Sequence, residues 1–126
     1  MAENHIDSNG VAQTIILEYF QSMMGDRSDV ISFYGHNAVL FWKGQEFSGN
    51  VEISAFLNSL PETITFQISG FEVQTVPNTD LWTMLVVFGT YQEPRSKLSD
   101  FHCTFIIDSK TDEKTAFIRY HHFQTY

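Results

Sequence analysis

The hydrophobic period of the chain changes at Pro61. Before this residue, apolar side chains recur every three to four positions, and after it they alternate with polar ones almost to the C-terminus. A period of about 3.6 residues is typical of an amphipathic helix, and alternation is typical of a strand. Helices followed by a run of strands predict an α+β fold in which the helices pack on one face of an antiparallel sheet.

The part before Pro61 is expected to contain three helices, over residues 11–24, 26–33 and 51–60. The second begins with an aspartate, and Asn50 precedes the third. Both side chains can accept the free N–H groups of a first turn, which predicts them as N-caps. Residues 38–42 are β-branched, aliphatic or aromatic apart from one alanine, and they predict a strand.

The part after Pro61 is expected to be all sheet. Its strands are predicted over residues 64–73, 81–91, 101–107 and 116–124, with connections at 77–80, 92–99 and 108–114. These connections are short enough to join antiparallel neighbours.

The first of these strands contains an irregularity. Its apolar phase is regular from Ile64 to Ile68 and then shifts by one residue to Phe71 and Val73. One extra residue near positions 69–70 accounts for the shift and predicts a β-bulge, which would bend the strand and curve the sheet.

Both faces of the predicted strand 81–91 are apolar. One face carries Trp82, Met84, Val86 and Phe88, and the other carries Leu81, Leu85, Val87 and Tyr91. An antiparallel sheet with one face in water normally alternates. The three helices can cover one face and no predicted element remains for the other, so the sequence predicts that another protein covers it. The alternatives are that the strand lies in a curled part of the sheet, or that the helices wrap around it.

Composition and charge exclude several classes of protein. The 126 residues are 43% apolar, which suits one domain, assigned here to residues 11–126 after a flexible tail over residues 1–10. The net charge of −8 disfavours direct binding to nucleic acid, because such binding depends on Lys and Arg. Cys103 is the only cysteine, so neither an intramolecular disulfide nor a cysteine-based zinc site can form, and a reducing compartment is expected. No segment has the roughly 18 apolar residues of a membrane span.

Five histidines raise the question of a metal or acid–base site. His121 and His122 are adjacent on a predicted strand, so their side chains point to opposite faces and cannot share one metal. The candidates for an acid–base pocket are Tyr19, Asp100, His102 and His121. Asp100 and His102 lie on the more polar side of their strand, where a solvated or partner-facing surface explains them more simply. Arg119 and His121 share one side of theirs, as core-edge groups or pocket residues. We expect no enzyme, no cofactor and no metal.

Several stretches of the sequence resemble the nuclear transport factor 2 family, over nearly the whole chain from Val11. The most specific is the Trp-x-Gly-x-x-Phe-x-Gly turn at residues 42–49. The others are residues 19–21, 56–61, 66–68, 100–101 and 123–124. The resemblance implies the cone-shaped fold of this family, a curved antiparallel sheet with three N-terminal helices packed on one face.

Three kinds of family member come into consideration. Carriers of the GTPase Ran have acidic residues where Lys43, Pro94 and Ser96 stand here, and a tryptophan near Ser8 that helps to bind Phe-Gly repeats. Residues 100–101 and the ending 123–126 instead resemble the export cofactors. The resemblance therefore implies a non-catalytic cofactor that heterodimerises with the matching domain of a TAP-type mRNA export receptor. Such a heterodimer binds Phe-Gly nucleoporins and shuttles between nucleus and cytoplasm through the nuclear pore. The alternatives are a homodimeric Ran-GDP import carrier and, less favoured, a small pocket enzyme.

The family's dimer face also carries over to this sequence by resemblance. It implies a partner-binding surface formed by Phe66, Ile68, Met84, Val86, Phe88, Thr104, Ile106, Tyr120 and His122. At His122 the export cofactors have an arginine that pairs with an acid in the receptor. Because an imidazole is mostly neutral at neutral pH, this sequence departs from the family at that charge pair.

Overall fold

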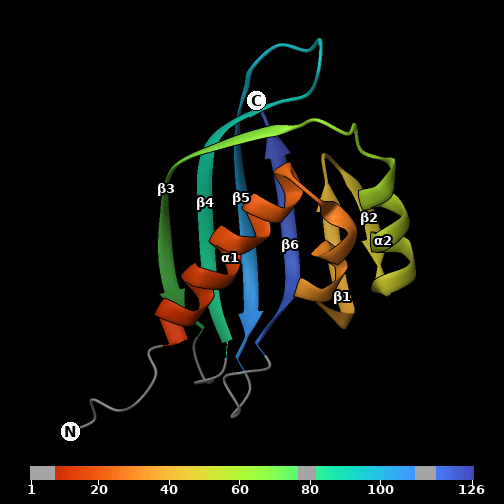
Figure 1. Cartoon of the computed structure of the whole chain (residues 1–126). Helices are drawn as coiled ribbons and strands as arrows, with labels where there is room; N and C mark the ends of the chain where they lie inside the picture. The colour runs from red at the N-terminus through yellow and green to blue at the C-terminus, as the bar shows by residue number, and fades with distance from the viewer. Residues whose placement is uncertain (1–7, 77–81, 110–115) are drawn as a thin grey trace, which may run out of the picture.

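The computed structural model describes residues 8–76, 82–109 and 116–126 and has an α+β architecture (Figure 1). The elements follow one another as α1 (Ser8–Met24), the 3-10 helix η2 (Arg27–Phe33), β1 (Tyr34–Trp42), β2 (Gln45–Ser48), α2 (Gly49–Ser59), β3 (Thr65–Thr75), β4 (Trp82–Gln92), β5 (Ser99–Asp108) and β6 (Phe117–Thr125). The order of three helices and a sheet is the one expected. The turn predicted at 77–80 and most of the one at 108–114 lie outside the described residues. No helix in the described ranges is long and apolar enough to cross a membrane.

Helix α1 crosses the curved face of the sheet diagonally (Figure 1). It begins at Ser8, three residues earlier than expected, and ends before Gly25 as predicted. Its apolar face is buried through Ala12, Ile16, Tyr19, Phe20 and Met23. Burial of a large apolar side chain stabilises the fold by about 1.5–3 kcal/mol, so α1 is fixed by packing on the sheet.

The two shorter helices differ in how they are capped. The Asp26 carboxylate accepts the Ser28 N–H at 3.0 Å, which confirms the predicted cap of η2. The prediction of Asn50 as the cap of α2 is wrong, because the helix begins at Gly49 and Ser48 occupies the cap position. The Ser48 N–H donates to the Glu52 carboxylate at 2.8 Å. The amide of Asn50 instead contacts His36 at 3.2 Å.

The six strands form one sheet in the order β2-β1-β6-β5-β4-β3. All described pairs are antiparallel except β1 with β6, which runs parallel. The register of β3 against β4 shifts between Ile68 and Gly70, which confirms the predicted bulge. Gly89 lies opposite Ile68, and a Cβ there would come within 1.9 Å of the Gln67 carbonyl oxygen. The close approach of β3 and β4 at the bulge therefore requires a glycine at this position.

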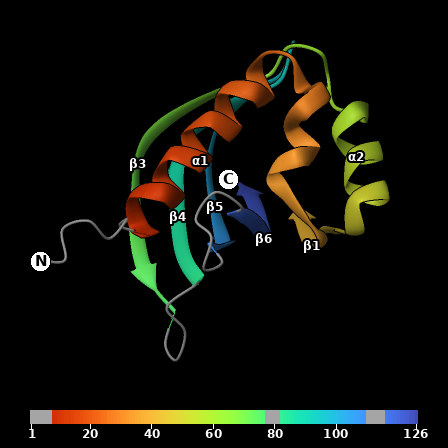
Figure 2. The same ribbon diagram turned by 60° about the horizontal axis from the view of Figure 1, so that its bottom comes forward.

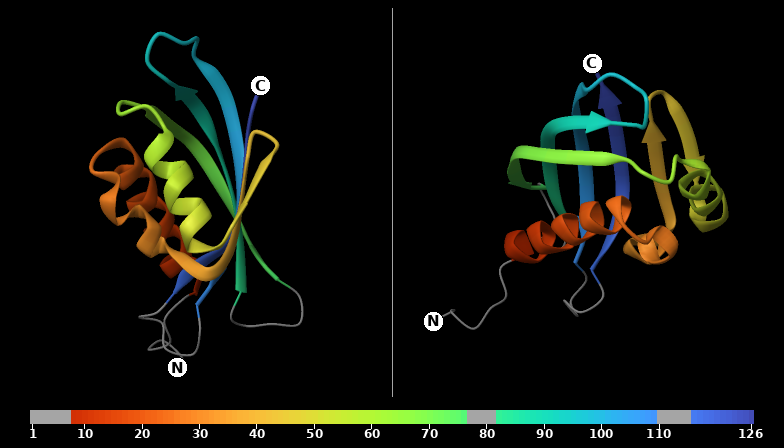
Figure 3. Two further views of the ribbon diagram at one scale, coloured as in Figure 1. Left: turned by 90° about the vertical axis from the view of Figure 1, so that its right-hand side faces the viewer. Right: turned by 45° about the horizontal axis from the view of Figure 1, so that its top comes forward.

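The molecule has two layers. Seen along the sheet, the helices lie together on the concave side, while the opposite side carries no other described element (Figures 2 and 3). The core between the layers is rich in aromatic rings, including Phe20, Trp42, Phe105 and Phe123. Trp42 and Phe123 stack with ring centroids 3.9 Å apart. We call the side of the sheet that faces the helices the inner face and the other side the outer face.

Candidate partner interface on the outer face of the sheet

The strand registers define which side chains lie beside one another on the outer face. Three rows of side chains start at β3. The first ends at β6 and contains Gly70, Phe88, His102 and Gln124. The other two reach β2 and contain Glu72, Val86, Thr104, His122, Phe41 and Glu46, then Gln74, Met84, Ile106, Tyr120, Val39 and Ser48. Trp82 and Asp108 begin a fourth row on β4 and β5. Successive rows are two residues apart, so the face measures about 20 Å along the strands and about 24 Å across them.

The middle of the outer face is apolar. Phe88 is 41% exposed, and its ring lies over Gly70, where a Cβ would meet it at 2.9 Å. On the neighbouring strands, Phe41 packs against Tyr120 with ring centroids 5.9 Å apart. Met84, Val86 and Ile106 are only partly covered within the chain. These side chains present apolar surface on the four central strands.

The two edges of the outer face are polar. The edge strand β3 presents Gln67, Glu72 and Gln74, and the edge strand β2 presents Glu46 and Ser48, all exposed. An apolar centre within a polar border is the usual anatomy of a protein–protein interface.

Each end of the face has an aromatic residue paired with a polar one. At one end the Arg119 guanidinium lies 4.5 Å from the centre of the Trp82 ring and 3.2 Å from the Asp108 carboxylate. At the other end Tyr126 stacks on His102, with centroids 5.1 Å apart, and its hydroxyl contacts the imidazole. Both arrangements fix large side chains before any partner binds, which lowers the entropy lost on association.

Seven of the nine residues assigned to a partner surface lie together on the outer face. They are Met84, Val86, Phe88, Thr104, Ile106, Tyr120 and His122. The other two, Phe66 and Ile68, lie on the inner face. Phe66 is only 5% exposed and its ring centroid is 4.9 Å from that of Phe20 in the core. Both residues precede the bulge in β3. There Phe66 lies opposite Tyr91 and Ile68 lies opposite Gly89 of β4, and these two β4 positions belong to the inner face.

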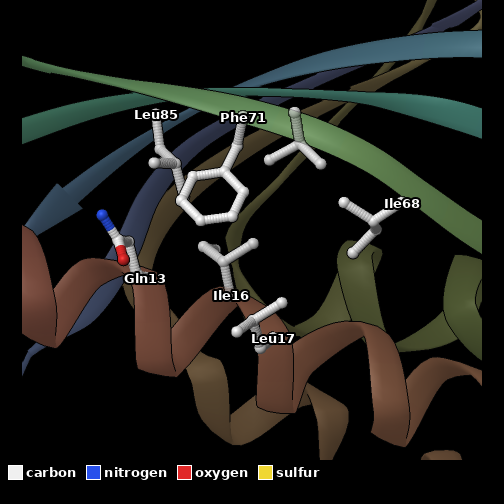
Figure 4. Close-up of a pocket in the computed structure, with 7 residues that line it drawn as sticks. Gln13, Ile16, Leu17, Ile68, Phe71 and Leu85 are labelled. Carbon is white, nitrogen blue, oxygen red and sulfur yellow. The ribbon is translucent and has the colours of Figure 1, made fainter.

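Ile68 helps to close the gap between the sheet and α1. Together with Phe71 and Leu85 it faces Gln13, Ile16 and Leu17 of the helix across a hollow of about 10 Å³ (Figure 4). A hollow of this size has room for about one water molecule. The region is therefore core packing, and Ile68 is not available to a partner on the outer face.

The nine residues assigned by resemblance omit three outer-face residues. Trp82 was already placed with Met84 and Val86 on one side of strand 81–91, whereas Val39 and Phe41 were not identified. Val39 and Phe41 alternate with buried Ala38 and Leu40 on β1. Because both sides of residues 38–42 are apolar, this strand carries the same two-sided pattern as 81–91. That pattern could have identified Val39 and Phe41 without a structure.

The candidates for an acid–base pocket do not form one site. Tyr19 and His121 lie on the inner side, whereas Asp100 is exposed and His102 lies on the outer face. Arg119 and His121 were expected on one side of β6, but the register shifts between Ile106 and Ile107, and Arg119 lies with the outer-face residues. A bulge in β6 thus separates the two side chains.

Tyr19, Tyr34 and His121 form a small polar cluster inside the core. The two hydroxyls are 2.7 Å apart, and His121 Nδ1 lies 3.0 Å from that of Tyr34 and 3.5 Å from that of Tyr19. The Phe105 ring stacks on His121 at 4.0 Å, and His121 Nε2 has no hydrogen-bond partner among the described residues. Burial raises the pKa of both tyrosines. Burial, with a smaller effect of nearby His122, lowers the pKa of His121 to about 3.

This buried imidazole should make stability depend on pH. In the unfolded chain a histidine takes up a proton near pH 6.5, but folded His121 does so only near its lowered pKa of about 3. The contribution of His121 to the free energy of unfolding is therefore complete above about pH 6.5 and is lost as the pH falls towards 3. We expect the free energy of unfolding to fall by about 2 kcal/mol between pH 7.5 and pH 5 from this group alone.

Urea denaturation at the two pH values, on the wild type and on His121→Phe, measures this contribution. The variant keeps the exposed histidines and the contact between the two tyrosine hydroxyls, so the difference between the two proteins isolates His121. An equal pH dependence in both proteins would contradict the assignment of a neutral, buried imidazole.

The fold and the outer face define a class of protein: a small α+β cone whose single curved sheet is covered by helices on one side and offers an apolar surface on the other. The model of the nuclear transport factor 2 (NTF2) domain family matches residues 11–120. The chain therefore belongs to this family, as its sequence motifs implied.

The curated relatives include two proteins named NTF2-related export protein 1. The one from Schizosaccharomyces pombe is 25% identical over 101 residues, covering 76% of this chain and 86% of the relative. The one from Bos taurus is 27% identical over 103 residues, covering 79% of this chain and 73% of the relative. Both named relatives are thus export proteins.

Solved structures agree with the fold. Nuclear transport factor 2 from Cryptosporidium parvum superposes with a TM-score of 0.82 at 20% identity, covering 93% of each chain. The yeast UBP3-associated protein BRE5 superposes with a TM-score of 0.84 at 15% identity, covering 96% of this chain and 98% of its own. A ketosteroid isomerase-like protein from Erwinia carotovora also matches, with a TM-score of 0.72 at 16% identity over 94% of this chain and 96% of its own. The fold is therefore shared by proteins of different function.

Proposed function

We propose that this protein is a non-catalytic nuclear export cofactor that heterodimerises, through its outer sheet face, with the matching NTF2-like domain of a TAP-type mRNA export receptor. The observation that carries the proposal is the apolar centre on β4, β5, β6 and β1 that no described element of the chain covers. The names of the two export-protein relatives support the export role.

The dimensions of the outer face suit this role. A patch of about 20 Å by about 24 Å amounts to several hundred Å² of surface, the scale of one side of a standard interface, roughly 800 Å² per partner. Left in water, the apolar centre of this face favours aggregation. Covering it would stabilise both subunits by mass action, because the partner binds only the folded chain.

The mechanism we propose is structural. The cofactor completes the receptor's dimer, and the heterodimer binds Phe-Gly nucleoporins and carries mRNA through the nuclear pore, so the protein shuttles between nucleus and cytoplasm. Contact with RNA is assigned to the receptor, because a net charge of −8 here repels phosphates.

A homodimeric Ran-GDP carrier is less well supported. Lys43 takes the place of an acidic residue of those carriers, and its ammonium lies 3.7 Å from the Glu93 carboxylate and 5.0 Å from the centre of the Tyr91 ring. The loop after β4 also has Pro94 and Ser96 at positions that are acidic in the carriers. At these three positions the chain therefore departs from the carriers, and Lys43 also neutralises part of the charge of Glu93.

A pocket enzyme is also less well supported. A general base works best with a pKa near the operating pH, whereas that of His121 is lowered to about 3. Tyr19 and His121 do approach each other, but both are fully buried, under rings such as that of Phe105. In the described structure this packing closes the imidazole off from solvent.

Co-expression with the NTF2-like domain of a TAP-type receptor tests the proposal. We expect the two chains to co-elute in size exclusion as a 1:1 complex, and native mass spectrometry to give the mass of the heterodimer. A chain that stays separate from the receptor domain would contradict the proposed function. Nucleotide-dependent capture of Ran by the chain alone would favour the carrier instead.

A further inference from the structure

The charges on the outer face are distributed unevenly. Glu46 on β2 and Glu72 on β3 lie at the two ends of the same row, on opposite edges of the sheet, and both are exposed. Asp108 is paired with Arg119 at 3.2 Å. In the part of the outer face that the structure describes, Arg119 is the only Lys or Arg side chain, and it is already engaged. The border of the apolar centre is therefore acidic on both sides.

A partner that covers the apolar centre also comes close to both acids. Carboxylates at the edge of an interface keep part of their hydration, so their effect is mainly on the association rate and on which partner binds. A partner with cations at these positions is drawn to the face, whereas one with acids there is repelled, which gives specificity through a difference in affinity.

The described outer face of a second copy lacks the required cations. Its own outer face offers Glu46 and Glu72 again, and its Arg119 is held by Asp108 and Trp82. Two copies also bring together two net charges of −8, which opposes association. Self-pairing through this face therefore leaves the acidic border without compensation.

We propose that Glu46 and Glu72 select the partner of the outer face: the partner is a different protein whose covering surface carries Lys or Arg side chains opposite these two acids. This inference rests on the proposed heterodimer and adds to it the charge that the other subunit must present.

Charge reversal at the two acids tests the proposal. The variants are Glu46→Lys, Glu72→Lys and the double variant, and the control is Glu18→Lys, an exposed position on α1 on the opposite side of the molecule. Association with the receptor domain is followed by stopped flow at pH 8, where ordinary imidazoles are neutral, from about 0.05 to about 0.5 M NaCl.

We expect the double variant to associate about 10-fold more slowly than the wild type at low salt, with a reversed or flat salt dependence and little change in the dissociation rate. The control should change the association rate by less than about 2-fold, because it alters the net charge but not the face. Equal effects of the double variant and the control would overturn the proposal.

The native mass of the chain alone separates this inference from the proposed function. We expect a monomer at micromolar concentration. A stable dimer that persists at high salt and is lost in Val86→Arg would overturn the inference even if the receptor domain also binds. Failure of the receptor domain to bind would count against the proposed function, and a monomeric chain would then still support the exclusion of a second copy.

Discussion

Replacing Val86 by arginine should weaken binding of the receptor domain at least 100-fold. Val86 lies in the middle row of the outer face, beside Thr104 on β5 and Glu72 on β3. The partner would bury an arginine there in the apolar centre. Even when it pairs with neighbouring Glu72, the arginine loses hydration and draws Glu72 away from the partner, and we expect the total cost to exceed the roughly 2.7 kcal/mol that corresponds to 100-fold in affinity. Titration calorimetry or surface plasmon resonance gives the change in Kd.

The chain offers a matched control for this substitution. Val51 on α2 is 84% exposed and lies on the helix side of the molecule, so Val51→Arg makes the same chemical change away from the face. We expect Val51→Arg to bind like the wild type, and both variants to melt within a few degrees of it. Phe88→Glu, at a phenyl ring of the face that is 41% exposed, should reproduce the loss. Retained affinity in Val86→Arg would show that the partner uses another surface.

The sequence predicted the fold well because the local pattern of apolar residues indicates the type of most helices and strands. The spacing of apolar residues differs before and after Pro61. The bulge near Ser69 is visible in the sequence as a one-residue shift in the alternation of apolar residues, and the strand register confirms it. The two-sided strand 81–91 predicted an uncovered face, and the outer-face residues of β4 agree with it. Alternation fixes which side chains share a face, because neighbouring side chains of a strand must point to opposite sides.

The sequence did not determine the register in which neighbouring strands pair. Phe66 and Ile68 were assigned to the partner face by resemblance, although β3 pairs them with Tyr91 and Gly89. Only that register decides which face they share. The separation of Arg119 from His121 depends in the same way on a register shift between β5 and β6. Such shifts change which face a residue occupies. In β6 polar side chains such as Arg119 and His121 interrupt the alternation, so the sequence pattern does not reveal the shift.

The buried cluster was predictable only in part. Tyr19 and His121 were both candidates, but Tyr34, which contacts each of them, was not. Tyr34 begins β1 directly after η2, and the sequence predicted a strand only from residue 38. Boundaries of elements are the least certain part of a sequence-based assignment, and here the missed residue lies at one.

Replacing Gly89 by alanine should destabilise the protein by at least about 3 kcal/mol, lowering Tm by roughly 10 °C or more. The new Cβ would lie 1.9 Å from the Gln67 carbonyl oxygen, which is backbone and cannot turn away as a side chain could. Relief requires β3 and β4 to separate at the bulge, with loss of the hydrogen bonds that hold the edge strand.

Two other glycines serve as controls, because alanine should destabilise the protein less at each of them. At Gly44 no atom lies within 4 Å of an added Cβ, but φ is +89°, so Gly44→Ala should cost only about 1 kcal/mol through backbone strain. At Gly25 the added Cβ would make an ordinary contact of 3.5 Å with the Gln21 carbonyl oxygen, and Gly25→Ala should be close to neutral. Thermal and urea denaturation of the three variants should therefore rank Gly89 far above Gly44, with Gly25 last. A mild effect at Gly89 would mean that β3 is free to move at the bulge. The edge of the outer face, and with it the position of Glu72, would then be set by the partner and not by the chain itself.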